Sequence, residues 1–122
     1  MRVQGSKHLH EPGEAGLVFQ NFTVAKTYLV CAIEYDNYRL VNDLGEPILA
    51  PIDRFEVIDP RTPKSFFTHD HGSGPGTFLV PGFFERWHDG DLRFQRLFDL
   101  EYQRLVAEDA ALNGPLPESP RV

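Results

Sequence analysis

The sequence has little of several features that define common classes of protein. It contains one cysteine among 122 residues, which excludes an intramolecular disulfide and indicates a reducing compartment. No apolar run approaches the length of about 18 residues at which a segment becomes a candidate membrane helix. Residues 1–16 contain no apolar stretch of the secretory kind. We therefore expect a cytoplasmic protein that does not enter a membrane.

Basic residues are also scarce. Twelve Lys and Arg stand against 18 Asp and Glu, which gives a net charge of -6. Because binding to nucleic acid needs basic surface, we expect no nucleic-acid partner for this acidic chain. The apolar fraction of 41% includes ten Phe, which is enough to build one core in a chain of single-domain length.

The composition along the chain divides it into a folded centre and two tails. Residues 1–16 are polar and contain three glycines, so we expect an N-terminal tail. Residues 17–114 are predicted to form a single domain, with a barrel over 17–80 and helices over 82–112. Residues 115–122 contain three prolines and are predicted to be a C-terminal tail.

The clearest strand is expected at 26–34, where apolar residues fall on both faces, as in a strand that is covered on both sides. Shorter strands are expected at 17–22, 38–42, 47–50, 55–58 and 77–80. Gly45 predicts a tight turn with positive φ, and Pro47 is restricted to a sheet edge or to the start of a strand. Residues 51–54 are predicted to form one helical turn.

The second half of the chain is predicted to contain more loop and helix. Three glycines and a proline in 68–76 favour a loop. A short helix is expected at 82–88. Asp91 is a suitable N-cap for a main helix over 92–112, where apolar residues recur at a helical spacing that predicts one buried stripe.

Several segments carry a family resemblance. They are Lys26-Thr-Tyr-Leu-Val30, Tyr38-Arg-Leu-Val-Asn-Asp-Leu-Gly-Glu46, Ala50-Pro51 and Phe55-Glu-Val57. Together they resemble the small SH3-like barrel proteins found widely in bacteria, many of them uncharacterised and others adaptor modules. The resemblance implies a mainly β fold, a β-rich α+β protein in which a small SH3-like barrel carries a C-terminal helical extension. It implies little about function, because its motifs are structural.

The most chemical motif is His69-Asp70-His71. Two histidines at i and i+2 on an extended segment point the same way and could share a zinc ion with a further ligand such as His88. One hypothesis is therefore a metal-binding protein, and its enzymatic form is a metal-dependent hydrolase with Asp70 or Glu85 as base. The other interpretation is that these histidines are surface residues in a polar loop.

An aromatic group on the short helix supports a different hypothesis. Phe83, Phe84 and Trp87, with Arg86 beside them, have the composition of a hot spot for a protein partner. The alternative is that these aromatic side chains close the base of the barrel. Cys31 lies within an apolar run and is expected to be a buried, inert thiol.

We expect from these patterns a small non-enzymatic protein-binding or regulatory module with an unidentified protein partner and no required cofactor. The loop at 72–76 superficially resembles a phosphate loop but lacks the Gly-Lys-Ser/Thr ending that such loops use. No group of residues forms a recognisable catalytic constellation. An acidic decoy for a nucleic-acid-binding enzyme is a weaker alternative, because the acidic residues are spread along the chain.

Overall fold

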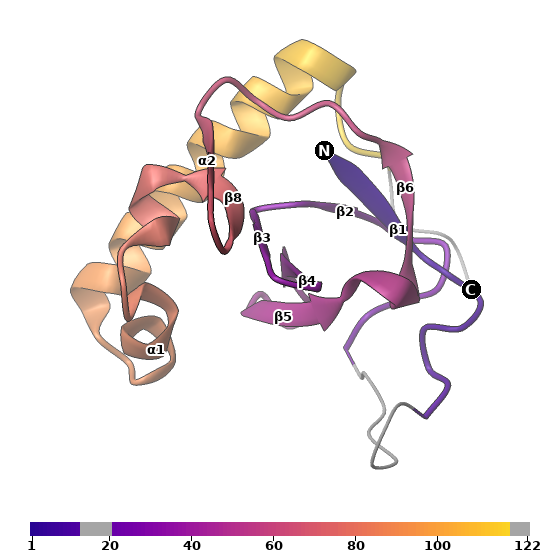
Figure 1. Cartoon of the computed structure of the whole chain (residues 1–122), viewed down its shortest axis with the longest axis horizontal. Coiled ribbons are helices and arrows are strands. Elements are labelled where there is room, and N and C mark those ends of the chain that lie inside the picture. The colour runs from indigo at the N-terminus through magenta and orange to yellow at the C-terminus, as the bar shows by residue number, and fades with distance from the viewer. Residues whose placement is uncertain (13–20, 118–122) are drawn as a thin grey trace.

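The computed structural model describes residues 1–12 and 21–117. Its strands are β1 (Arg2–Gly5), β2 (Thr27–Leu29), β3 (Ala32–Glu34), β4 (Asn37–Val41), β5 (Pro47–Pro51), β6 (Phe55–Asp59), β7 (Phe66–His69) and β8 (Gly72–Pro75). They form two antiparallel sheets, one in the order β2-β1-β6 and the other in the order β5-β4-β3-β8-β7. Helices α1 (Phe83–His88) and α2 (Leu92–Asn113) lie together on one side of the strands (Figure 1). The protein is β-rich with a C-terminal helical part, and the described strands do not close into one barrel.

The segment 26–34 carries buried residues on both faces, as predicted, but it forms two strands in different sheets and not the single strand that was expected. β2 belongs to the first sheet and β3 to the second, so the chain changes sheet at Val30 and Cys31. Because side chains alternate along extended backbone, Tyr28 and Val30 enter one core while Leu29 and Cys31 enter another.

The first core is formed mainly by buried residues from the strands of both sheets. An aromatic group lies at its centre, in which Phe22, Tyr28 and Phe55 contact one another edge to face with ring centroids 5.3 to 6.1 Å apart. Val3, Leu40 and Ala50 complete it without any exposed surface. The predicted strand at 17–22 lies mostly outside the described residues, but Phe22 is part of this core.

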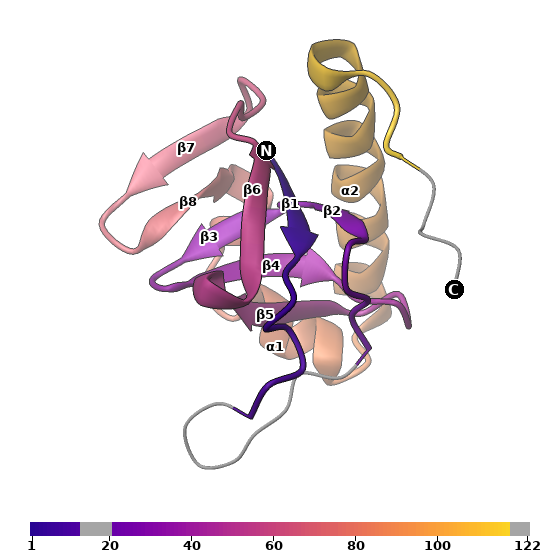
Figure 2. The ribbon, with the colours of Figure 1, turned by 90° about the vertical axis from the view of Figure 1, so that its right-hand side faces the viewer.

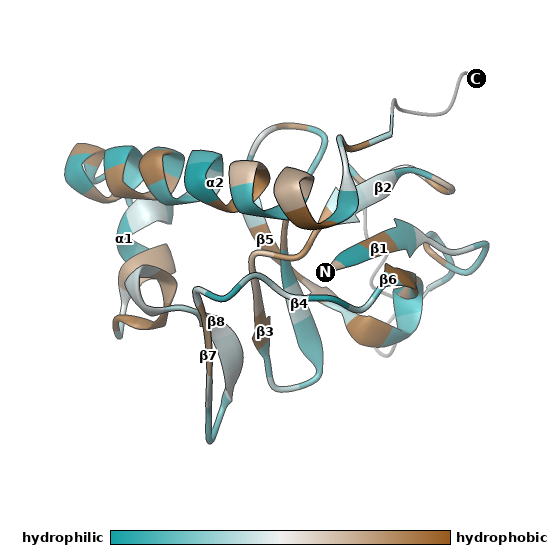
Figure 3. Cartoon of the chain, turned by 90° about the horizontal axis from the view of Figure 1, so that it is seen from above, coloured by the Kyte–Doolittle hydropathy of each residue, from teal (hydrophilic) through white to brown (hydrophobic). Residues whose placement is uncertain are grey.

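The second core is formed where the helices cover the strands. α2 contributes a stripe that includes Phe98 and Leu105, and hydrophobic and hydrophilic residues alternate around it (Figure 3). Phe98 stacks on Phe78 with ring centroids 5.2 Å apart. The side chain of Asp91 accepts a hydrogen bond from the backbone N–H of Arg93, which confirms the predicted N-cap of the main helix.

Local turn chemistry was predicted correctly between β4 and β6. Gly45 has φ +80° in the turn between β4 and β5, and Pro47 begins β5, which is an edge strand. Ile52–Arg54 forms a single 3₁₀ turn before β6.

The prediction of a tail over residues 1–16 is wrong for residues 1–12, while residues 13–16 lie outside the described part. β1 is the central strand of the three-stranded sheet and pairs with both β2 and β6. Val3 and Leu9 are fully buried. The sequence of this segment does not indicate a central strand, because the polar residues Arg2 and Gln4 flank its one large apolar residue, Val3.

The predicted loop over 68–76 and strand over 77–80 are also wrong. Phe66–His69 and Gly72–Pro75 form the antiparallel hairpin β7–β8, which extends the five-stranded sheet beside β3 (Figure 2). Residues 76–79 form a 3₁₀ turn. A Cβ atom at Gly72 would lie 1.7 Å from the carbonyl oxygen of Ile33. The glycine therefore allows β8 to approach β3.

A buried ion pair joins the start of the described chain to its last helix. Arg2 donates two hydrogen bonds, of 3.0 and 2.8 Å, to Oδ2 of Asp109, and also contacts the carbonyl oxygen of Gly114. Asn113 donates a hydrogen bond of 2.9 Å to the other carboxylate oxygen. Asp109 has no exposed surface. These bonds satisfy a carboxylate whose burial without a partner would be costly.

Candidate binding site

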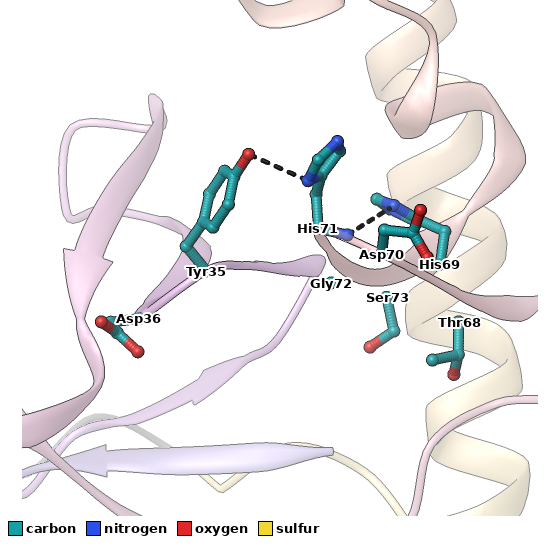
Figure 4. A pocket seen from close by; sticks show the side chains of 8 residues that line it. All are labelled: Tyr35, Asp36, Thr68, His69, Asp70, His71, Gly72 and Ser73. Carbon is teal, nitrogen blue, oxygen red and sulfur yellow. Dashed lines mark hydrogen bonds between the residues drawn. The ribbon is translucent and has the colours of Figure 1, made fainter.

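The turn between β3 and β4 meets the turn between β7 and β8, although they are far apart in sequence. The backbone N–H of Tyr35 donates a hydrogen bond of 2.8 Å to the carbonyl oxygen of His71. The Tyr35 hydroxyl lies 2.9 Å from Nδ1 of His71, a hydrogen-bond distance (Figure 4). The two rings have centroids 5.2 Å apart. Backbone and side chain therefore hold both turns together.

Tyr35 is held in an unusual conformation. Its φ is +55°, in the left-handed region that large side chains rarely adopt. Such a conformation costs on the order of 1 kcal/mol or more and persists only where surrounding contacts determine it. The side chain is nevertheless 70% exposed. A strained residue that presents an aromatic ring to solvent is a candidate contact residue.

His69 and His71 lie near each other, but not on one extended segment as predicted: His69 ends β7, and His71 lies in the turn that follows. The backbone N–H of His71 donates a hydrogen bond of 3.2 Å to Nδ1 of His69, and the imidazole centroids are 5.9 Å apart. Both side chains are exposed. His71 and Tyr35 thus form a small aromatic surface with His69 at its side.

Two hollows of about 470 and 510 Å³ lie beside these turns. Tyr35, His69 and His71 line both of them, so the hollows adjoin at this aromatic surface. We call the two hollows together the turn groove. The first continues along Asp36 and Asp70, and the second continues toward Val80 and the start of α1.

The buried side chain of Arg39 lines the second hollow of the turn groove. Arg39 donates hydrogen bonds of 2.8 and 3.2 Å to the two carboxylate oxygens of Glu34. Its guanidinium carbon lies 3.9 Å from the centroid of the Phe84 ring. A further hydrogen bond of 3.3 Å reaches the carbonyl oxygen of Pro47. The charge of Arg39 is therefore already matched within the fold.

The proposed zinc ligands do not converge. His88 lies elsewhere, with Nε2 3.1 Å from the carbonyl oxygen of Pro47. Within residues 1–12 and 21–117, no three His, Cys, Asp or Glu side chains gather in a way that could hold a metal ion. His69 and His71 alone lack the third ligand that a stable site requires. The structure thus gives no support to the metal-binding hypothesis.

The aromatic residues predicted to bind a partner are largely part of the second core. Phe83 and Phe84 are 2% and 7% exposed, so they are not available to another protein. Arg86 is exposed, with its guanidinium carbon 5.0 Å from the centroid of the Phe94 ring. Trp87 is half-buried against Phe98. Of the predicted group, Arg86 and one side of Trp87 remain at the surface.

Cys31 is unreactive for a physical reason. Complete burial raises the pKa of its thiol to about 12, although the positive charge of Arg39 acts in the opposite direction. Because the thiolate is the nucleophilic form, this cysteine stays a thiol at neutral pH. The expectation of a buried, inert thiol is confirmed.

Sequence reasoning missed Tyr35 and Arg39 as site residues. Neither residue belongs to a motif that the sequence made recognisable. A usable signal was present at Tyr35, since the first position of a two-residue turn usually holds Gly, Asn or Asp, and here a large aromatic residue precedes Asp36. Nothing in the local sequence connects that turn with His71.

The chain matches no protein-family model, no curated protein and no solved structure. In the described part of the chain, no helix has both the length and the apolar character needed to span a membrane. Any functional conclusion therefore depends on the geometry of the site.

Proposed function

We propose that this chain is a small non-enzymatic protein-binding module that contacts its partner through the turn groove. The observation that carries the proposal is Tyr35, an exposed aromatic side chain fixed between two adjoining hollows by its contacts with His71. Rigid aromatic side chains at a concave surface provide large contact area with little loss of conformational entropy, and they dominate many protein interfaces.

The proposal includes an SH3-like core. Four features support it. They are the β4–β5 hairpin, the 3₁₀ turn that precedes β6, the pairing of β6 with β1, and the bent segment that runs from β2 in one sheet to β3 in the other. The β7–β8 hairpin and the two helices are additions to that core. Because the added hairpin supplies His69 and His71, we place the specific function in the addition.

The proposal also includes a cytoplasmic, reducing location and a protein rather than a nucleic-acid partner. The single buried thiol is compatible with such a compartment. Carboxylates surround the turn groove, and phosphate groups would be repelled by them.

Photo-crosslinking tests the proposed surface. Tyr35 is replaced by the photoreactive residue p-benzoylphenylalanine, and Leu100, which is 66% exposed on α2, is replaced in a control protein. A partner captured only from position 35 is then purified and its affinity measured by calorimetry. Tyr35→Ala is expected to weaken binding roughly 30-fold, as hot-spot residues do.

Leu100→Ala serves as the matched control in the affinity measurement. It removes an exposed apolar side chain outside the turn groove and is expected to change affinity less than about twofold. Equal effects of the two substitutions would contradict the proposed surface, because binding would then not depend on Tyr35.

A further inference from the structure

The charges around the turn groove have one predominant sign. Four carboxylate side chains line it: Glu34, Asp36, Asp70 and Glu85. Arg39 is the single Lys or Arg among the described residues of the lining. A ligand that enters the groove therefore meets an excess of negative charge, on a protein whose net charge is already -6.

Arg39 does not reverse this sign, because Glu34 neutralises it. Both guanidinium hydrogen bonds to Glu34 lie within the protein, and Arg39 is 7% exposed. Asp36 and Asp70 line the first hollow and Glu85 lines the second, and all three side chains are exposed. Three carboxylates thus remain to interact with a ligand.

The wall of the groove already demonstrates how a guanidinium is held there. Arg39 lies between the Glu34 carboxylate and the face of the Phe84 ring, which combines a charge-assisted hydrogen bond with a cation–π contact. Tyr35 and His71 offer exposed aromatic rings in the hollow that Asp36 and Asp70 also line, with the Asp36 carboxylate pointing away from the Tyr35 ring (Figure 4). A second cation brought by a ligand would find the same two kinds of partner.

The second hollow adds an apolar surface to these charges. Val80 is 50% exposed, and Pro81 follows it at the rim. A ligand that fills both hollows must therefore present apolar as well as cationic groups. An extended peptide presents every second side chain to one face, so a segment with cationic and apolar residues at positions i, i+2 and i+4 offers both kinds to the groove at once.

We infer that the turn groove binds an extended basic segment of the partner protein, in which the side chains that face the groove include both Arg or Lys and apolar residues. This inference rests on the proposed function and adds the chemistry of the bound segment. The cationic side chains interact with Asp36, Asp70 and Glu85 and with the ring of Tyr35, while the apolar side chains contact Val80. An acidic segment would be repelled at every one of these carboxylates.

A defined peptide tests the inference. The probe is a fluorescein-labelled peptide, Gly-Arg-Ser-Arg-Ser-Val-Ser-Gly, in which two Arg and one Val share a face when the peptide is extended. Its binding to the full chain is followed by fluorescence anisotropy in 150 mM salt, a concentration that limits long-range attraction to about 8 Å. A second peptide with Glu in place of Arg is the charge control. We expect the basic peptide to bind and the acidic peptide to show no saturable binding.

Matched protein variants separate the groove from general attraction to an acidic protein. The double variant Asp70→Asn/Glu85→Gln removes two groove carboxylates. The double variant Asp99→Asn/Glu56→Gln removes the same charge from exposed positions outside the groove. We expect the first to weaken binding at least tenfold and the second less than twofold.

Three results would overturn the inference: equal weakening by both double variants, equal binding of both peptides, or no binding of the basic peptide. In each case the proposed function is tested independently, by photo-crosslinking from position 35. If Tyr35→Ala still weakens the binding of the captured partner, the groove binds a protein segment of different chemistry.

Discussion

At the scale of the residue, Asp43 has an unusually large number of partners for a turn residue. Its carboxylate accepts hydrogen bonds from Thr23 Oγ1 at 2.7 Å, Lys26 Nζ at 2.6 Å and Tyr28 O–H at 2.9 Å. Its backbone N–H donates to the carbonyl oxygen of Asn21 at 2.7 Å. Asp43 thereby joins the segment before β2 to the β4–β5 turn.

These contacts predict an effect of pH on stability. Partial burial acts to raise the pKa of Asp43, but hydrogen bonds from Lys26, Thr23 and Tyr28 outweigh burial and hold the pKa below its ordinary value. The stabilisation is therefore complete above the pKa of Asp43 in the unfolded chain and is lost as the pH falls through the pKa in the folded protein.

Asp43→Asn is expected to lower the free energy of unfolding at pH 7 by about 1–3 kcal/mol, because charge-assisted hydrogen bonds are lost. Urea titrations at several pH values measure the difference from the unsubstituted protein. The difference should shrink below about pH 4, where the carboxylate of the unfolded chain gains its proton. A difference that stays constant from pH 7 to pH 2 would show that ionisation of Asp43 is unimportant.

Residues whose roles depend on neighbours in sequence were predictable. Gly45 and Asp91 follow local rules for turns and helix caps, and Cys31 lies in a run of apolar residues. Tyr35 and Asp43 were not predictable as contact residues. Their partners lie 36 and 15 or more residues away, and only the assembled sheets bring them together.

At the scale of the element, the β7–β8 hairpin shows how glycine can conceal a strand. Gly72 and Gly74 are typical of loops, and this composition predicted a loop. In the structure they lie against β3, where side chains have no space: a Cβ at Gly74 would be 2.9 Å from the Cβ of Ala32. The strand is identified by close backbone contact, which local composition does not reveal.

Gly72→Ala is expected to displace β8 from β3 and to destabilise the protein strongly. Gly72 has φ +152°, and its substituted Cβ would overlap the carbonyl group of Ile33. We expect a loss of more than about 2 kcal/mol, measured by thermal and urea unfolding, together with faster hydrogen exchange in β7 and β8.

Gly76→Ala is the control for this substitution. At Gly76 the nearest atoms to an added Cβ are those of the Phe67 ring, at 3.9 and 4.0 Å, which is ordinary contact. Its stability should change by less than about 1 kcal/mol. If Gly72→Ala were tolerated as well as Gly76→Ala, close approach of β8 to β3 would not be required for the fold.

At the scale of the whole molecule, two cores share one bent segment. The sequence predicted the β-rich class and the C-terminal helix, because the continuous apolar run in 26–34 and the helical spacing in 92–112 are strong patterns. It did not predict how the chain starts. A central strand with Arg2 in it is explained only by a carboxylate at the other end of the protein, Asp109.

Asp109→Ala is expected to destabilise the protein by about 3–5 kcal/mol, because it leaves the buried charge of Arg2 without its partner. The matched control is Asp99→Ala on the exposed face of the same helix, which should cost less than about 0.5 kcal/mol. Both values are obtained from urea unfolding at neutral pH.

The double variant Arg2→Met/Asp109→Leu tests whether Arg2 and Asp109 stabilise the fold as an ion pair. Replacing both members by apolar residues of similar size removes the unpaired charge, so it should recover much of the stability lost in Asp109→Ala. If the loss of unfolding free energy in the double variant equalled the sum of the losses in the two single variants, the two side chains would not act as a pair.

The same pair has a consequence for the order of events while the chain is being made. Arg2 and Asp109 are separated by 107 positions, and bacterial and eukaryotic ribosomes add roughly 5–20 residues each second. β1 can find β6 once residue 59 has emerged, but Arg2 must wait on the order of ten seconds for its carboxylate. During that interval the β4–β5 hairpin can form from local contacts alone. Arg2 is therefore among the last residues of the described fold to gain its buried partner.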